Sequence, residues 1–138
     1  MSAALYLPDT NLLSAYAANR DKALVERVEA NAAGMLLSAV VLAEMEYGWR
    51  KAGGTKRVQR QKALAAALAV HDFDTDSARA YGVIKNLLLH GAGNARPIGE
   101  RDMLIAAQAY ALGAVLITRN VREFAAVPGL TVENWEGN

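Results

Sequence analysis

Three carboxylates, far apart in the sequence, give the first indication of chemistry. Asp9 follows a short apolar run, Glu44 has apolar neighbours at helical spacing, and Asp102 opens an apolar helical segment. Carboxylate oxygens are the ligands that Mg²⁺ and Mn²⁺ prefer in proteins. Such ions orient a water molecule and stabilise the negative charge that builds on a phosphoryl oxygen. The three residues therefore predict a divalent-metal site, if the fold gathers them.

Each acid also has a structural interpretation. Asp9 is suited to cap a helix N-terminus, and Asp102 to offset a helix dipole. Glu44 is expected to point inward because its neighbours one turn away are Val40, Val41, Tyr47 and Gly48. An inward carboxylate needs a cation, and both a metal ion and an arginine from elsewhere in the chain satisfy this need. Glu46 differs, since Arg50 four residues later favours an exposed ion pair.

Two polar residues lie at the end of the clearest predicted strand. Thr118 closes this strand, and Asn120 follows two residues later on the same face of an extended chain. Both residues are also common in turns. Because open α/β sheets bind ligands at the carboxyl ends of their strands, we expect both side chains near Asp9.

Short apolar strands alternating with helices must position these residues. Such alternation predicts βαβ units and a largely parallel sheet covered on both faces. A chain of 138 residues predicts one domain spanning residues 1–138. The expected strands are Ala4–Leu7, Met35–Ser38, Val70–Phe73, Ala114–Thr118 and Thr131–Glu133. The expected helices are Asp21–Ala33, Ala39–Lys51, Thr55–Ala69, Thr75–His90, Glu100–Leu112 and Val121–Ala126, with a loop over Ala92–Pro97.

Composition excludes several classes of site. The chain has no cysteine, which excludes disulfides, thiolate metal sites and a cysteine nucleophile and favours a cytoplasmic location. No apolar run reaches the roughly 18 residues of a membrane span, so no membrane association is expected. The N-terminal segment lacks the basic region of a signal peptide. The net charge of +1 indicates no partner, so any electrostatic argument must be local.

Four blocks of sequence, in order along nearly the whole chain, resemble PIN-domain nucleases, and most of all their VapC branch, the toxins of type II toxin–antitoxin modules. Residues 7–14 read LPDTNLLS and residues 38–48 read SAVVLAEMEYG. Residues 98–107 read IGERDMLIAA, and the C-terminal block combines LITRNVREF at 116–124 with VPGLTVENW at 127–135. The match of all four blocks in register is more specific than the DTN motif alone.

The resemblance implies a PIN-like three-layer α/β/α sandwich with a short parallel central sheet. It implies a Mg²⁺- or Mn²⁺-dependent endoribonuclease that forms a homodimer, cleaves RNA and is inhibited by a cognate VapB-like antitoxin. The family's acidic positions fall on Asp9, Glu44 and Asp102, which are the expected metal ligands. Asn120 occupies the fourth position, where many PIN domains have aspartate. Thr118 and Asn11 are expected to orient these ligands.

Residues 50–62, RKAGGTKRVQRQK, contain six basic residues and no acid. A solvated helix face is the ordinary meaning of such a run. The functional alternative is a surface that holds RNA phosphates, with Lys56, Arg57 and Arg60 as its candidates.

Two other functions remain open at this point. One is a non-catalytic PIN-like module that binds RNA or protein, which Asn120 favours and the three carboxylates oppose. The other is a haloacid-dehalogenase-like phosphatase, which would need an aspartate where Asn11 stands. A further departure is Gln108, which occupies a position where many PIN relatives have histidine.

Overall fold

The computed structural model describes residues 4–90 and 98–137, so the whole loop expected over residues 92–97 lies outside the described residues. In these ranges no helix combines the length and apolar character that crossing a membrane requires. The elements before the gap are β1 (Tyr6–Pro8), α1 (Thr10–Ala18), α2 (Lys22–Asn31), a 3₁₀ turn (Ala32–Gly34), β2 (Leu36–Ser38), α3 (Ala39–Ala52), α4 (Lys56–Ala67), β3 (Ala69–His71) and α5 (Thr75–His90). After it come α6 (Glu100–Leu112), β4 (Val115–Ile117), α7 (Val121–Phe124) and β5 (Thr131–Glu133).

All strand pairs in the described residues are parallel, which confirms the predicted sheet. One sheet has the order β1–β4–β5, and β2 pairs with β3 in a second. A single parallel bridge between Tyr6 and Met35 joins them, giving the overall order β3–β2–β1–β4–β5. Since parallel strands end at the same edge of a sheet, the residues that follow β1, β2 and β4 share that edge.

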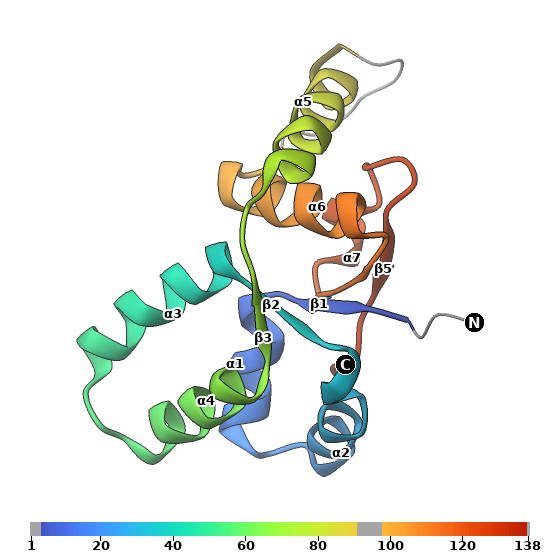
Figure 1. The fold of residues 1–138 in the computed structure, drawn as a ribbon. Helices are drawn as coiled ribbons and strands as arrows, with labels where there is room; N and C mark the ends of the chain where they lie inside the picture. Colours follow the sequence, from blue (N-terminus) through green and yellow to red (C-terminus); the bar gives the residue numbers. More distant parts are fainter. Residues whose placement is uncertain (1–3, 91–97, 138) are drawn as a thin grey trace.

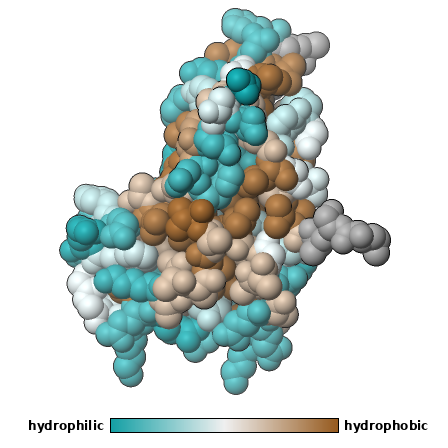
Figure 2. All heavy atoms as spheres, in the orientation of Figure 1, coloured by the Kyte–Doolittle hydropathy of each residue, from teal (hydrophilic) through white to brown (hydrophobic). Residues whose placement is uncertain are grey.

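Helices cover the strands on two sides (Figure 1). Helices α5, α6 and α7 lie on one side, and α1, α2 and α4 lie on the other. The main core is built from side chains of both layers and of the strands, and a smaller core lies between α5 and α6. Figure 2, in the same orientation as Figure 1, shows apolar residues gathered across the middle of the visible surface and hydrophilic residues along its lower end. The architecture is the expected three-layer α/β/α sandwich.

Side-chain caps explain where several helices begin. The carboxylate of Asp9 accepts the backbone N–H of Leu12 and so starts α1, while Thr55 starts α4 in the same way. The sequence indicated a cap at Asp9 but no bounds for α1. Asn19 ends this helix with φ 55°, in the left-handed region that asparagine tolerates.

Gln108 has a structural role. Its fully buried side chain lies on α6, where Oε1 accepts a hydrogen bond of 2.5 Å from the Ser38 hydroxyl. Its Nε2 donates to the carbonyl of His71 at 3.0 Å. Ser38 also accepts the backbone N–H groups of Val40 and Val41 at the start of α3. The amide therefore joins α6 to the ends of β2 and β3.

Candidate active site

Asp9 lies at the carboxyl edge of the sheet, directly after β1, and is only 3% exposed. Its Oδ1 accepts the Leu12 N–H at 3.1 Å, so the capping interpretation is correct. Its Oδ2 accepts the Thr118 hydroxyl at 2.5 Å and the Asn11 amide at 3.4 Å. Burial raises the pKa of Asp9, hydrogen bonds from Thr118 and Leu12 oppose this rise, and the charge of Asp102 adds to it. Within the described residues, no lysine or arginine forms an ion pair with Asp9.

Thr118 and Asn120 follow β4, which pairs directly with β1. The Thr118 hydroxyl donates to Asp9 and accepts the backbone N–H of Asn120 at 3.0 Å, so it fixes both neighbours. The Asn120 carbonyl accepts the N–H of Glu123, whereas its side chain forms no cap on α7. This edge therefore holds a buried carboxylate, a hydroxyl and an amide from adjacent strands.

Arg101 connects the other two predicted acids. Its Nη2 lies 2.7 Å from Asp102 Oδ1, and its Nη1 forms an ion pair with Glu44 Oε2. Partial burial lowers the pKa of Arg101, but hydrogen bonds to Glu44 and Asp102 outweigh this and raise it overall. Of the two cations that the sequence left open for Glu44, the structure supplies an arginine.

Glu44 is less enclosed than its apolar neighbours predict. Its side chain is 29% exposed, and Oε1 accepts the Thr10 hydroxyl at 2.8 Å. The reason is that Tyr47, one turn later, is itself exposed and leaves this part of α3 open. Glu46 forms the expected surface pair with Arg50 at 2.5 Å.

The donor set suits a hard divalent cation, although no three acidic or histidine side chains in the described ranges are already grouped around one point. Among the described residues, the buried carboxylate of Asp9 has no cationic ion-pair partner, and the charge of Asp102 repels it. A divalent cation between these two carboxylates would remove that repulsion. Glu44 is a third carboxylate near this edge, and its ion pair with Arg101 competes with a cation for the negative charge of that side chain.

A fourth carboxylate, Glu136, approaches Asp9 from the C-terminal segment. Its side chain is 14% exposed, and its Oε2 is buried with no hydrogen-bond partner in the described part of the chain. Burial raises the pKa of Glu136, Arg119 opposes this, and the Asp9 charge adds to it. Arg119 lies 3.8 Å from Glu136 and donates to Asn11 at 3.2 Å.

Arg101, Arg119 and Glu136 were not among the residues predicted from the sequence. Arg101 and Arg119 are each adjacent in sequence to a residue already singled out, and that adjacency was the available signal. Glu136 carries no such signal, because only the fold brings the segment after β5 back to Asp9.

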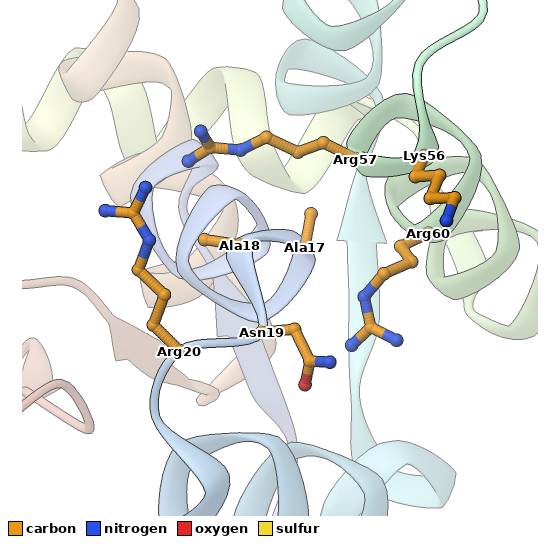
Figure 3. Close-up of a pocket in the computed structure, with 7 residues that line it drawn as sticks. All are labelled: Ala17, Ala18, Asn19, Arg20, Lys56, Arg57 and Arg60. Atoms are coloured by element: carbon orange, nitrogen blue, oxygen red, sulfur yellow. The ribbon is translucent and has the colours of Figure 1, made fainter.

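The predicted basic residues lie away from the acids. Lys56, Arg57 and Arg60 line a pocket near the C-terminal end of α1, whereas Asp9 stands at its N-terminal end (Figure 3). A nine-residue helix separates these ends by about 13 Å.

Comparison with known proteins places these features in a family. Residues 6–130 match the PIN domain. The chain is 32% identical over 131 residues to tRNA(fMet)-specific endonuclease VapC of Salmonella typhimurium, covering 94% of this chain and 97% of that protein. It is 33% identical to ribonuclease VapC2 of Rickettsia felis, covering 96% and 98%. The solved structure of VapBC2 from Rickettsia felis, bound to a promoter DNA fragment, aligns with a TM-score of 0.83 at 29% identity, covering 96% and 99%.

Proposed function

The chain belongs to the PIN-domain family, and on that basis we propose that it is a Mg²⁺- or Mn²⁺-dependent endoribonuclease and the toxin of a toxin–antitoxin pair. The observation that carries the proposal is the buried carboxylate of Asp9. It lies beside Asp102 at the carboxyl edge of the sheet, with no cationic partner among the described residues. The similarity of the chain to named ribonucleases, over nearly its full length, supports RNA as the substrate.

Each residue at this edge has a separate role in the proposal. Asp9 and Asp102 would hold the divalent cation, and Glu44 would be its third carboxylate ligand. When bound, the cation supplies Lewis acidity and a template for the attacking water and the phosphate. Thr118 and Asn11 keep Asp9 in one orientation through their hydrogen bonds. Asn120 offers a neutral amide at the same edge.

Two glutamates on α3 provide a matched test of this site. E44Q removes a proposed ligand, whereas E46Q removes a surface carboxylate two residues away that pairs with Arg50. We expect E44Q, D9N and D102N to lower the rate of RNA cleavage in Mg²⁺ and Mn²⁺ by at least tenfold, and E46Q to retain it. Equal activity of E44Q and E46Q removes Glu44 from the site, and full activity of D9N refutes the proposed centre.

The proposed partners are RNA, a second copy of the chain and a VapB-like antitoxin. The antitoxin is proposed because similar solved structures, from Rickettsia felis and Salmonella typhimurium, are VapBC assemblies. Homodimer formation and a cytoplasmic location stay predictions. Light scattering of the purified chain, alone and with the product of a neighbouring reading frame, measures both assemblies.

The alternative function is a PIN-like module that binds without cleaving. Asn120 in place of an acid is the feature that favours it. Calorimetric titration with Mn²⁺ separates the nuclease from the non-catalytic module. A nuclease should bind Mn²⁺ and lose that binding in D9N, whereas a non-catalytic module should show no Mn²⁺ binding that depends on Asp9.

A further inference from the structure

We propose that the basic pocket beside the C-terminal end of α1 binds a phosphate of the RNA backbone, a few nucleotides from the phosphate cleaved at the acidic edge. This inference rests on the proposed ribonuclease function and adds a second point of attachment for its substrate. The pocket has a volume of about 290 Å³ and lies between residues 17–20 and the first turns of α4. Figure 3 shows its basic side chains, Arg20, Lys56, Arg57 and Arg60.

The charge of this pocket is not neutralised by its surroundings. No acidic side chain lines it, and none of its four basic residues forms an ion pair within the described ranges. Other arginines in those ranges do pair with carboxylates, as Arg50 does with Glu46. Four cations from two segments line this pocket without an acid, which favours an anionic ligand.

One of the four is fixed, and the other three are accessible. Arg60 is half-buried: its Nη2 donates to the Tyr16 carbonyl at 3.3 Å, and its guanidinium lies 5.1 Å from the Tyr16 ring centroid. It forms the wall of the pocket. Arg20, Lys56 and Arg57 are exposed, and Figure 3 shows the guanidinium ends of Arg20 and Arg57 on the same side of α1. A planar guanidinium fork matches the oxygens of a phosphate, and a lysine adds a point charge.

The position relative to the acidic edge favours RNA over other anions. The acids Asp9, Asp102, Glu44 and Glu136 outnumber Arg101 and Arg119 at this edge, so a polyanionic substrate gains attachment from cationic groups elsewhere on the protein. Helix α1 connects the edge to the pocket over about 13 Å. A nucleic-acid strand advances about 3.4 Å per phosphate along a duplex axis and further when extended. The two sites are therefore about four nucleotides apart or fewer.

The test compares two double variants of the full chain. R20A/R57A removes two exposed cations from the pocket, and R50A/R79A removes two exposed arginines that pair with acids on their own helices. Binding of a fluorescent 12-nucleotide single-stranded RNA is measured by anisotropy in EDTA, over a range of salt concentrations. Circular dichroism melts check that both variants remain folded.

We expect R20A/R57A to weaken RNA binding at least tenfold and to reduce the slope of log K against log salt by about 0.7 for each phosphate that the variant no longer neutralises. R50A/R79A should stay near the wild-type values. If the two variants bind RNA equally while the wild type cleaves RNA, the inference is overturned and the proposed function stands. If R20A/R57A loses only binding of the antitoxin, the pocket belongs to an acidic protein segment and the inference is again wrong. A wild-type chain that neither binds nor cleaves RNA refutes both proposals.

Discussion

Replacing Arg101 with alanine tests how Glu44 and Asp102 are held together. Arg101 pairs with Glu44 and Asp102 while 43% of its side chain stays exposed. Partly exposed ion pairs contribute about 0.2–1 kcal/mol each. Loss of both pairs should lower the free energy of unfolding by about 0.5–2 kcal/mol in buffer without divalent cations. Urea denaturation in EDTA measures this change.

The same variant should bind Mn²⁺ more tightly. A cation bound by Glu44 and Asp102 competes with Arg101 for both carboxylates, so the free energy of these ion pairs opposes binding. Removing the arginine removes this opposition, and a change of about 1.4 kcal/mol corresponds to tenfold in affinity. We therefore expect R101A to lower the Mn²⁺ Kd by about 2- to 30-fold in calorimetry and to increase the rise in Tm on adding Mn²⁺.

Two further variants define the result. R50A removes an ion pair with Glu46 and should leave the Mn²⁺ affinity unchanged. R101K keeps the charge but lacks the guanidinium fork that spans two carboxylates, so its affinity should lie between wild type and R101A. An Mn²⁺ Kd in R101A that is unchanged or weaker refutes the competition between Arg101 and the ion.

Three other predictions concern Asp9, Glu136 and two glycines. The pKa of Asp9 is raised in the folded state, so the fold binds more protons than the unfolded chain and loses stability as pH rises above the ordinary value of 3.8. In EDTA, D9N should therefore be at least as stable as wild type at pH 7, with the advantage absent near pH 3, and urea denaturation showing D9N less stable at pH 7 contradicts this. E136Q should weaken Mn²⁺ binding several-fold in calorimetry if Glu136 shares the ion with Asp9, and an unchanged Kd limits Glu136 to holding Arg119. G34A places a Cβ 2.8 Å from the backbone oxygen of Ala4 and should lower Tm. The Cβ of G48A meets open space in a helix, so this variant should raise the free energy of unfolding by about 0.5–1 kcal/mol. Equal melting points of the two variants would refute the steric argument.

Much of the fold could be predicted because its signals are local. The helices Thr75–His90 and Glu100–Leu112 match the prediction to the residue, since apolar periodicity and the glycine after each define their ends. Helix α1 received no bounds because its C-terminal signal is Asn19, a residue that also serves in turns. The parallel pairing followed from strand–helix alternation, but the single bridge between Tyr6 and Met35 depends on tertiary packing.

The site was less accessible to sequence reasoning. Residue type and position within each element singled out Asp9, Glu44 and Asp102 as candidates, because strand ends and helix faces can be read locally. What neutralises Glu44 could not be decided, since Arg101 lies 57 residues away in sequence. The approach of Glu136 to Asp9 is set by the return of the C-terminal segment across the sheet edge, and no spacing rule predicts it.

The hydrogen bond between Ser38 and Gln108 affects more than the residues around it. Ser38 begins the helix that carries Glu44, and Gln108 sits on the helix that carries Asp102. This hydroxyl and this amide therefore tie together the two helices that carry the proposed ligands Glu44 and Asp102. Without this hydrogen bond, α3 and α6 would be free to shift relative to each other. The proposed RNA cleavage would then fall while the overall fold remains.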